Sequence, residues 1–356
     1  MMTRALPRKG DCIFRGLRMK KSYNVAVVGA TGVVGQTQLC VLEERRFPVA
    51  ELLPLASGRS AGQMVRFRGR DVEVREATPD AFAGVDIVFF AATGELSKTL
   101  APEAVRRGAV VIDKSSTWRM DPRVPLVVPE INPEAVAKHE GIISCPNCTT
   151  IGFVMALEPI RRLAGVRSVT VTTLQAVSGA GREGIEELAA QERAAADGKE
   201  APEPHAFARP IFENVLPLCE RFRDDGYSTE EVKLLDETRK ILSDPEIKVA
   251  MTCVRVPVPV GHSCSMLVET VRPVTPAAAQ AALAAFPGVR LVDDPSHNVF
   301  PTPLDVSGRD EVLVGRVRRD LTSDRLWLWS VIDNLRKGAA TNAVQIAEEL
   351  IARKLI

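Results

Sequence analysis

The chain has 356 residues, of which 46% are hydrophobic and 26% are charged, an ordinary composition for a globular protein. A formal net charge of +1 gives no overall field that would recruit nucleic acid or an anionic membrane, and no stretch approaches the roughly 18 apolar residues of a membrane-spanning helix. Seven cysteines, odd in number and widely scattered, argue against a disulfide framework and favour a reducing, cytoplasmic location.

The first 24 residues, "MMTRALPRKGDCIFRGLRMKKSYN", carry seven basic side chains and one acidic side chain, Asp11. They lack the apolar segment of a secretory signal and the serines of an organellar transit peptide. Met19 begins "MKKSYNVAVVGA", directly before the first expected strand. We therefore expect residues 1–20 to be a disordered extension or a consequence of the choice of start site.

The first half of the chain alternates buried-strand patterns with helical ones. Residues 24–28 form an apolar run, a glycine-rich turn follows, and helical spacing continues through Val33, Leu39 and Leu42. Further strand patterns lie at 51–57, 86–93 and 109–116, with a helical pattern at 97–108. Apolar strands that alternate with helices predict a parallel sheet covered on both faces, which is the Rossmann-type, doubly wound α/β fold.

The pattern changes after Cys148. A helix is expected at 150–165, a strand at 168–181 and a helix at 182–198, followed by strand-like segments at 248–271, 289–294, 311–320 and 325–334. Successive strands predict an α+β domain with a mixed sheet. Residues 334–356 have the spacing of an amphipathic helix that returns to the first domain. The patterns predict one domain at 21–147 and 335–356 and a second at 148–334.

The pattern G-x-x-G-x-x-G at Gly29, Gly32 and Gly35 stands between the first strand and the first helix. Glycines let the backbone approach a pyrophosphate closely, and the N-terminus of the helix supplies amide donors and a favourable dipole. A purely structural turn can have the same pattern, so its place in a strand–turn–helix unit decides the interpretation. We expect cofactor contacts at Gly29, Thr31, Gly32, Val33, Val34 and Gly35.

The end of the second expected strand bears on the identity of the dinucleotide. NAD sites commonly place an acidic residue there to bind the ribose 2′-hydroxyl. This chain has "ASGRSAG" instead, with Ser57, Arg59 and Ser60 and no acid. A guanidinium with two hydroxyls suits a 2′-phosphate, so the sequence favours NADP(H), the alternative being a solvated arginine in a loop.

Cys145 and Cys148 have the C-x-x-C spacing of a redox dithiol, half of a metal site, or one nucleophile beside an inert cysteine. A zinc site needs a second pair of ligands, and "GHSC" at 261–264 is a poor substitute, so no metal is expected. Cys148 is expected at a helix N-terminus, where the macrodipole can lower a thiol pKa below its usual value of about 8.5. The spacing alone leaves open that both cysteines are simply buried.

Six motifs resemble those of the aspartate-semialdehyde dehydrogenase family, in that family's order: "GATGVVG", "LASGRSAG", "PNCTT", "LQAVSGAG", "RVPVPVGHS" and "DNLRKGAATNAVQIAEEL". The resemblance covers nearly the whole chain after residue 20. It implies the reversible, NADPH-dependent reductive dephosphorylation of L-aspartyl-4-phosphate to L-aspartate 4-semialdehyde and phosphate. This step serves lysine, threonine, methionine and diaminopimelate biosynthesis. The resemblance also implies a homodimer, with residues 148–334 as the catalytic and dimerisation domain.

The resemblance implies the catalytic residues as well. Cys148 matches the nucleophile, His262 in "GHS" the acid/base, and Gln175 the residue that orients the covalent intermediate. A thiolate would expel phosphate to form a thioester, which a cofactor hydride would then reduce. An imidazole pKa of about 6.5 suits proton transfer in both directions. The family often has asparagine where this chain has Cys145, which makes Cys145 the inert cysteine.

Further matches concern the substrate and the cofactor. Arg255 in "RVPV" matches the arginine that binds the substrate α-carboxylate, and Arg119 and Lys233 match the pair that binds phosphate. Glu230 matches the acid that faces the substrate ammonium, with Glu231 beside it as the alternative. Without the resemblance Arg119 and Arg255 would pass as surface ion-pair partners, and Lys233 as part of a solvated helix face. Additional cofactor contacts are expected at Ser178, Gly179 and Asn334.

Three other functions are compatible with these patterns. N-acetyl-γ-glutamyl-phosphate reductase has the same domain plan and thioester chemistry, but its acylated amine would not require the carboxylates of Glu230 and Glu231. A reductase of acyl-CoA thioesters is a further alternative of the same fold. A catalytically silent NADP-binding paralogue is the non-enzymatic alternative, and the presence of both Cys148 and His262 argues against it.

Overall fold

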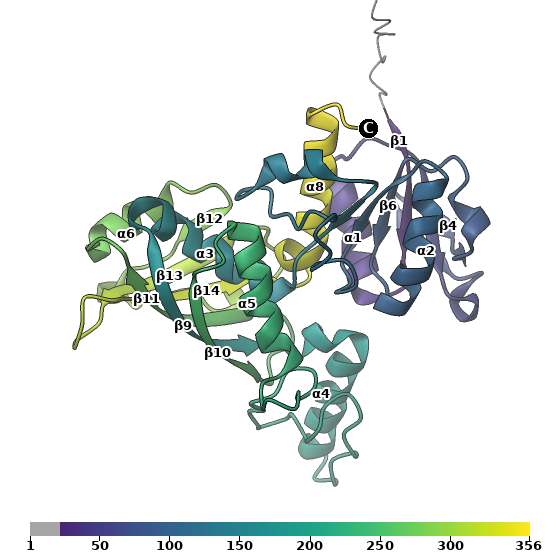
Figure 1. Ribbon diagram of the computed structural model, residues 1–356. Helices are drawn as coiled ribbons and strands as arrows, with labels where there is room; N and C mark the ends of the chain where they lie inside the picture. Colours follow the sequence, from purple (N-terminus) through teal and green to yellow (C-terminus); the bar gives the residue numbers. More distant parts are fainter. Residues whose placement is uncertain (1–21) are drawn as a thin grey trace, which may run out of the picture.

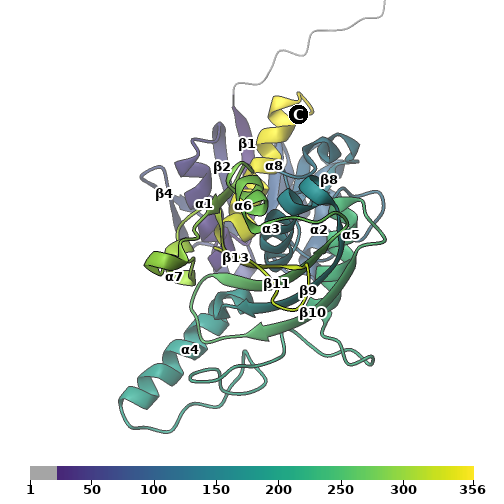
Figure 2. The ribbon, with the colours of Figure 1, turned by 90° about the vertical axis from the view of Figure 1, so that its left-hand side faces the viewer.

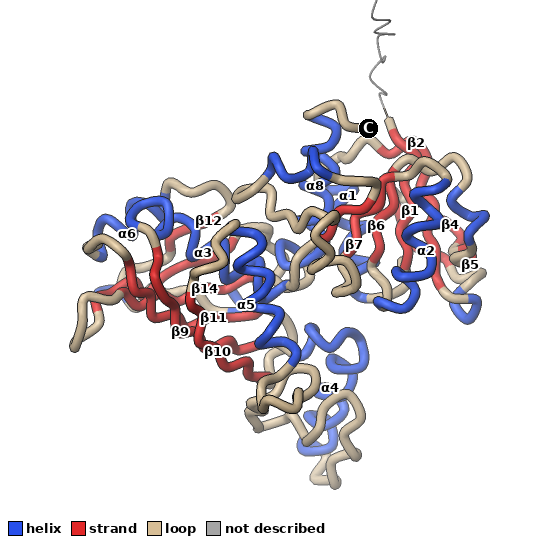
Figure 3. Tube along the Cα trace, viewed as in Figure 1, coloured by secondary structure: helices blue, strands red, loops and turns tan. Residues whose placement is uncertain are grey.

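The computed structural model describes residues 22–356 and contains two six-stranded sheets joined by the helices between them (Figure 1). The expectation for residues 1–20 lies outside the described residues. The strands lie in two groups, one on each side of the molecule (Figure 3). No helix within residues 22–356 is both long and apolar enough to cross a membrane.

The first sheet is entirely parallel, with the order β5-β2-β1-β6-β7-β8. Its strands are β1 (Tyr23–Val28), β2 (Val49–Ala56), β5 (Arg75–Glu76), β6 (Ile87–Phe90), β7 (Val110–Asp113) and β8 (Ile142–Ser144). The helices of this half are α1 (Val33–Glu44), α2 (Gly94–Arg106) and α8 (Thr341–Ala352). The expected strands and helices are present, and the Rossmann-type fold class is confirmed.

Both faces of this sheet are covered, which explains why its strands are continuously apolar. Along β1, Val25 and Val27 pack into the cluster that contains α1 and α8, whereas Ala26 and Val28 pack into the cluster that contains α2. Three features were not predicted: the two-residue β5, the three-residue β8 and a hairpin of β3 (Met64–Phe67) and β4 (Arg70–Glu73). All three are too short for periodicity to reveal.

The second sheet is mixed, because β9 pairs parallel with β10 and antiparallel with β11. Its order is β10-β9-β11-β14-β13-β12. The strands are β9 (Val166–Gln175), β10 (Lys248–Arg255), β11 (His262–Thr270), β12 (Val289–Leu291), β13 (Val312–Arg319) and β14 (Leu326–Ile332). The predicted α+β half is confirmed, with the expected strand 168–181 ending at Gln175 and the expected segment 248–271 divided into two strands.

One face of the second sheet packs against α3 (Cys148–Ala164), α5 (Thr229–Leu242) and α6 (Pro276–Ala284). On the other face, the short α7 (Pro303–Val306) packs only at the β13–β14 end. Elsewhere on that face, side chains of β9 and β10 such as Thr170, Thr172 and Thr252 are exposed. Helix α4 (Gly181–Ala196) and the chain that follows it project away from both sheets (Figure 2).

The C-terminal segment differs from the single helix expected from residue 334. A π-helical turn at Arg336–Ala340 precedes α8, and Asp333 accepts the backbone N–H groups of Leu335 and Arg336 at 2.9 and 3.0 Å. A Cβ at Gly338 would lie 3.0 Å from Cys148 Cβ, so this turn is pressed against the start of α3. The irregular start of the C-terminal helix coincides with this contact to Cys148. Helical periodicity in the sequence does not reveal such a contact.

Candidate active site

Cys148 is the first residue of α3, and the residue before it caps the helix. The side-chain oxygen of Asn147 accepts the backbone N–H groups of Thr149 and Thr150 at 2.8 and 3.4 Å. An asparagine in this position satisfies amide groups that have no partner within the helix. The cap therefore fixes the direction in which the backbone presents Cys148.

Cys148 lines a cavity of about 270 Å³. The walls come from the start of α1, the chain after β7, the loop before α3, α5 and the turn before α8. The other lining residues are Val34, Lys114, Ser116, Arg119, Pro146, Asn147, Ser178, Gly179, Glu220, Lys233, Asn334, Leu335, Gly338 and Ala339. Both halves of the chain thus contribute to one cavity, and it holds seven of the residues expected from the sequence.

The expected depression of the Cys148 pKa is wrong for the protein without ligands. Burial raises the pKa of this thiol to about 11, and the negative charge of Glu230 adds to the effect. The cations Arg119 and Arg255 oppose the rise without overcoming it. The helix N-terminus is only one contribution, and the loss of solvation is larger, so the resting sulfur is a thiol.

Cys145 has no place in the cavity lining. Its side chain is fully buried, and Sγ lies 3.2 Å from Asn342 Nδ2, which donates a hydrogen bond to it. Burial raises the pKa of the Cys145 thiol. Both cysteines are free thiols in this structure, so the geometry gives no support to a dithiol pair.

His262 is the first residue of β11 and is 1% exposed. Its Nδ1 accepts the backbone N–H of Ala176 at 3.0 Å, so the neutral ring carries its proton on Nε2. Nε2 is buried and has no hydrogen-bond partner among the described residues. Burial and the charge of Arg255 lower the pKa of His262 well below its usual value. A Cβ at Gly179 would lie 3.1 Å from Nε2, which places this ring beside the cavity.

Glu230 connects three residues around the nucleophile. Its carboxylate accepts hydrogen bonds from Asn147 Nδ2 at 3.0 Å, from Thr149 Oγ1 at 3.3 Å and from Gln175 Nε2 at 3.2 Å. Glu230 is 4% exposed, and its charge acts on the Cys148 thiol. The expected residues Gln175, Glu230 and Cys148 are therefore brought together.

Glu231 has a different environment. Its side chain accepts the backbone N–H of Ser228 at 2.6 Å and completes the capping box at the start of α5. It also accepts the backbone N–H of Cys253 in β10 at 3.0 Å. These bonds tie α5 to the second sheet, so Glu231 has a structural environment, whereas Glu230 is bonded to the first turn of the nucleophile's helix without lining the cavity.

Arg255 ends β10 and is 5% exposed. Nη1 donates to the backbone oxygen of Ala176 at 2.7 Å, and the guanidinium lies 5.8 Å from the centre of the Phe207 ring. Its Nε is buried without a partner among the described residues. Arg255 lines a second cavity of about 510 Å³ that shares Gly179 and Glu220 with the first. A buried donor of this kind is suited to an anionic ligand group.

Arg119 is 7% exposed and is held on several sides. Nη1 donates to Glu237 Oε1 at 2.8 Å, Nε to the Cys145 oxygen at 3.1 Å and Nη2 to the Lys114 oxygen at 2.6 Å. The second oxygen of Glu237 accepts the backbone N–H of Asn147 at 2.7 Å. One buried carboxylate therefore links this guanidinium to the backbone ahead of the nucleophile.

Lys233, the second expected phosphate ligand, lies in α5 and lines the same cavity. Its ammonium pairs with Glu220 and lies 3.6 Å from Glu230 Oε2. A phosphate that binds here would have to compete with Glu220 for the ammonium. Glu220 was not singled out from the sequence, because it lies in an irregular segment far from the quoted motifs.

The glycine turn has the geometry expected of a dinucleotide loop. Gly29 has φ +84°, and a Cβ on Gly29 or Gly35 would overlap neighbouring backbone atoms. Gly32 is the N-cap of α1 and has no side chain to satisfy the first N–H groups of the helix. Val34 lines the cavity of Cys148, so the loop and the nucleophile border one space. These residues fit a dinucleotide whose pyrophosphate meets the helix N-terminus.

Ser57, Arg59 and Ser60 lie at the end of β2, where Gly58–Ser60 form a short 3-10 turn. Ser57 and Arg59 are exposed, and none of the three lines the cavity of Cys148. A carboxylate that the sequence analysis did not place there lies close by, since a Cβ at Gly58 would be 3.1 Å from Glu76 Oε1. Glu76 comes from β5, which only the sheet pairing brings to this corner.

Ser178 and Asn334, both in the second half of the chain, are bonded to each other at the cavity. Asn334 Nδ2 donates to Ser178 Oγ at 3.0 Å, and Asn334 Oδ1 accepts the backbone N–H of Gly261 at 3.0 Å. Both residues line the cavity, as expected from the sequence. Thr31 does not line this cavity. Its backbone oxygen accepts a hydrogen bond from Arg182 of α4 at 2.9 Å.

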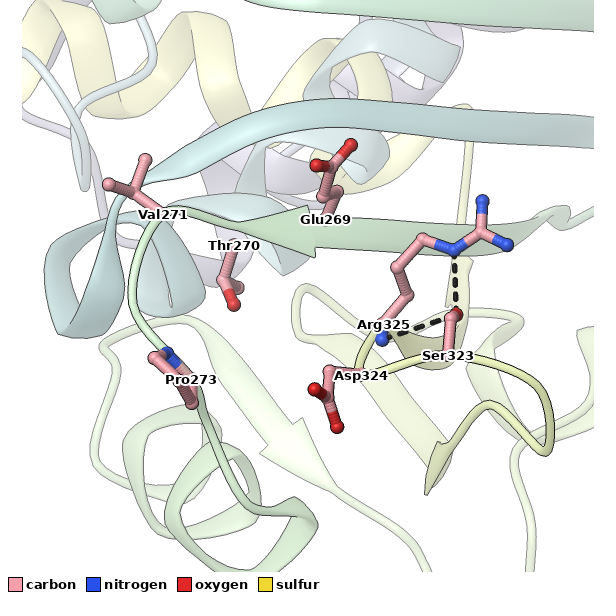
Figure 4. Close-up of a pocket in the computed structure, with 7 residues that line it drawn as sticks. All are labelled: Glu269, Thr270, Val271, Pro273, Ser323, Asp324 and Arg325. Carbon is pink, nitrogen blue, oxygen red and sulfur yellow. Dashed lines mark hydrogen bonds between the residues drawn. The ribbon is translucent and has the colours of Figure 1, made fainter.

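A hollow of about 410 Å³, larger than the cavity of Cys148, is lined by none of the expected residues (Figure 4). It is lined by Glu269, Thr270, Val271, Pro273, Ser323, Asp324 and Arg325. Thr270 and His262 are the two ends of β11, so this hollow lies at the far end of that strand from the cavity of Cys148. Arg325 Nε is already bonded to Ser323 Oγ at 2.8 Å.

Two family models match the chain. The model described as "Semialdehyde dehydrogenase, NAD binding domain" matches residues 24–139, and "Semialdehyde dehydrogenase, dimerisation domain" matches residues 157–337. The first match covers the glycine turn, and the second covers His262 and the carboxylates of α5. The fold and the cavity thus define a dehydrogenase of the semialdehyde class.

Individual related proteins and solved structures identify the family within this class. The aspartate-semialdehyde dehydrogenase of Aquifex aeolicus is 52% identical over 338 residues, which are 94% of this chain and 99% of the relative. The structure of aspartate semialdehyde dehydrogenase II from Vibrio cholerae complexed with ASA is 47% identical, covers 94% of this chain and 99% of its own, and has a TM-score of 0.91. The enzyme from Candida albicans, solved with NADP, is 26% identical with a TM-score of 0.73, covering 94% of this chain and 100% of its own. The chain belongs to the aspartate-semialdehyde dehydrogenase family.

Proposed function

We propose that this protein interconverts L-aspartyl-4-phosphate and L-aspartate 4-semialdehyde through a thioester on Cys148, with a nicotinamide dinucleotide as redox partner. The observation that carries the proposal is the shared cavity, in which Cys148, three cationic residues and the glycine-loop helix meet. The A. aeolicus relative, 52% identical, carries the name of this activity. The free amine of the substrate is consistent with the position of Glu230, whose carboxylate lies beside the nucleophile.

The reaction needs one bond to form and one to break at the acyl carbon. The Cys148 thiolate would attack that carbon, and phosphate would leave toward Arg119 and Lys233, whose charges stabilise it. The bound nicotinamide supplies the hydride for reduction and accepts it in the reverse direction. Collapse of the resulting thiohemiacetal releases the aldehyde and the Cys148 sulfur.

His262 would exchange protons at Nε2. With Nδ1 bonded to the Ala176 N–H, the neutral ring presents Nε2–H, which can donate to an oxygen that gains negative charge at the acyl carbon. To accept the proton of the Cys148 thiol, the ring must move its own proton to Nδ1 and give up that backbone contact. We infer that substrate binding favours this exchange, since the charges around the ring change at that point.

The two charged ends of the substrate would be held by Arg255 and Glu230. The buried Nε of Arg255 is suited to the α-carboxylate, and Glu230 is suited to the ammonium. Gln175 already donates to Glu230 and would orient the acyl group beside Cys148. An N-acetylated amine would bring no positive charge to Glu230, which disfavours the related reductase.

We infer a preference for NADP(H), because Arg59 is exposed at the end of β2 and could meet a 2′-phosphate. Glu76 nearby opposes that preference, since a carboxylate repels the 2′-phosphate and can bind a 2′-hydroxyl. A comparison of KM for NADP⁺ and NAD⁺ in the wild type and Arg59→Ala tests the inference. A selective rise in KM for NADP⁺ is expected, and equal KM values for both cofactors before and after the change would refute it.

We also infer a homodimer in which the uncovered face of the second sheet meets a second copy. Thr170, Thr172 and Thr252 are exposed on that face, and the match to a dimerisation domain supports this surface. Residues 335–356 are assigned to the cofactor domain, because α8 packs on α1. Free cysteines are consistent with a cytoplasmic location.

The first test is the phosphate-dependent reduction of NADP⁺ with aspartate semialdehyde, compared with NAD⁺ and with N-acetylglutamate semialdehyde. Phosphate-dependent turnover with aspartate semialdehyde is expected. Turnover only with the N-acetylated aldehyde would identify the related reductase instead. Measurable NADPH binding without turnover of either aldehyde would identify a silent paralogue.

A further inference from the structure

Lys114 is a cation in the active-site cavity to which neither the sequence analysis nor the proposed mechanism gives a role. It follows the last residue of β7, and its side chain lines the same cavity as Cys148, Arg119 and Lys233. The side chain is half-buried because one side of it faces this cavity. It is therefore within the space that substrate and cofactor must share.

The partners of the Lys114 ammonium are few. Nζ donates to Gln38 Oε1 at 2.7 Å, on the buried face of α1, and it forms no ion pair with a carboxylate among residues 22–356. The nearest acid in sequence, Asp113, is bonded to Ser97 and Ser115. An ammonium has three donors, so the charge and part of its hydrogen-bonding capacity are left for a ligand.

The surroundings make that free charge costly. Gln38 is fully buried, and its Nε2 has no hydrogen-bond partner within residues 22–356, so the protein beneath Lys114 supplies a single side-chain acceptor, Gln38 Oε1. Burial lowers the pKa of Lys114 to about 8. A buried cation without a counter-ion is unfavourable until an anion binds, and the anion then gains a short, weakly screened contact.

We propose that Lys114 binds a phosphate group inside this cavity, as a third cation beside Arg119 and Lys233. Arg119 Nη2 donates to the backbone oxygen of Lys114 at 2.6 Å, so the two residues are held together. Val34 at the start of α1 lines the same space, so two sources of phosphate are available. One is the acyl phosphate or inorganic phosphate, and the other is the pyrophosphate of the dinucleotide. The proposal rests on the proposed function only for the identity of these ligands.

The test compares Lys114→Met and Lys114→Arg with Lys98→Met, a matched change at an exposed lysine of α2. KM for inorganic phosphate and KM for NADP⁺ are measured separately with the full-length enzyme and aspartate semialdehyde. Loss of a charge-assisted contact predicts a KM about 10- to 100-fold higher for one of the two, with partial recovery in Lys114→Arg. A rise for phosphate assigns the acyl-phosphate site, and a rise for NADP⁺ assigns the pyrophosphate site.

The pH dependence provides an independent readout. The titratable groups that act on Lys114 are Asp113 and Cys145, Arg119 is bonded to its backbone oxygen, and Lys233 and Glu220 line the same cavity. Lys114 is cationic below its pKa, so the affected KM should rise between pH 7 and 9 in the wild type. The Lys114→Met variant should lose that part of the rise.

Two outcomes would overturn the proposal. One is a Lys114→Met variant with both KM values within twofold of the wild type. The other is an equal rise in both KM values in Lys98→Met. If Lys114→Met fails to fold, Lys114→Arg decides, because a guanidinium keeps its charge throughout this range and should abolish the rise of the affected KM between pH 7 and 9. An unchanged rise in Lys114→Arg would overturn the proposal. If the wild type shows no turnover with aspartate semialdehyde, calorimetric titration with inorganic phosphate and NADP⁺ tests Lys114 independently of the proposed reaction.

Discussion

Arg119 and Glu237 form a buried ion pair, with 2.8 Å between Nη1 and Oε1. Glu237 is 1% exposed, and its other oxygen accepts the backbone N–H of Asn147, the residue directly before Cys148. A single carboxylate on α5 thus fixes both a candidate phosphate ligand and the start of the nucleophile's helix. Displacing this carboxylate would alter both parts of the site together.

The Glu237→Gln variant should bind phosphate more weakly. The amide keeps the size of the side chain but removes the charge that orients Arg119, at a cost of about 1.5–3 kcal/mol. We expect KM for phosphate to rise by at least about tenfold, with a smaller fall in kcat. The control is Asp236→Asn, which removes a carboxylate from the neighbouring position of α5. A lower melting temperature with an unchanged KM for phosphate would reduce Glu237 to a purely structural role.

The two cysteines should respond differently to substitution. Cys148→Ser should lose turnover by more than about 10³-fold, because the hydroxyl is a far weaker nucleophile, while binding of NADPH survives. Cys145→Ala should keep most activity, since its sulfur accepts a bond from Asn342, donates a long one of 3.9 Å to the Ala339 oxygen, and does not line the cavity. Steady-state turnover and NADPH fluorescence titration give the two readouts. Comparable losses of turnover in both variants would restore the dithiol hypothesis.

The free enzyme should react slowly with iodoacetamide at Cys148 near neutral pH. Burial and Glu230 raise the pKa of this thiol to about 11, so the thiolate is scarce and its fraction grows as pH rises. Removing the charge in Glu230→Gln lowers that pKa, so alkylation at pH 8 should accelerate even as turnover with the amino substrate falls. Peptide mapping separates Cys148 from the exposed Cys40. Slower alkylation in Glu230→Gln would contradict the electrostatic argument.

The fold was largely predictable because its signals are local. The apolar runs of β1, β6 and β7 and the glycine turn before α1 each lie within a few consecutive residues, so periodicity identifies them. Two-sided burial of the first sheet follows from the same runs. The π-helical turn at Arg336–Ala340 was missed, because it depends on contacts with Asp333 and with the start of α3.

Residues of the site could be predicted only where they lay within a recognisable sequence motif. Glu237 pairs with Arg119 across 118 positions of sequence, and no local pattern marks a carboxylate for that purpose. Asn147 lay inside a quoted motif, and its capping role could have been found from its place directly before the helix. The Cys148 pKa could not be predicted, because the helix dipole is visible in the sequence whereas burial and the charge of Glu230 are not.

Lys337 and Glu130 form a buried pair whose loss should destabilise the fold. Lys337 is 0% exposed, and Nζ donates to Glu130 Oε2 at 2.7 Å, to Gln345 Oε1 at 2.7 Å and to Asn342 Oδ1 at 3.1 Å. Lys337→Met leaves the Glu130 carboxylate without its counter-ion, so we expect the free energy of unfolding to fall by about 3–5 kcal/mol.

The double variant Lys337→Met/Glu130→Gln separates charge from packing. Removing both charges leaves no unpaired ion, so urea unfolding should recover a substantial part of the lost stability. Gly338, the residue after Lys337, lies against Cys148. If the turn before α8 positions the nucleophile, the double variant should therefore recover kcat together with stability. The exposed Lys354→Met provides the matched control near the same C-terminus. A double variant as unstable as Lys337→Met would show that the packing of the lysine stem, and not the uncompensated carboxylate, determines the loss.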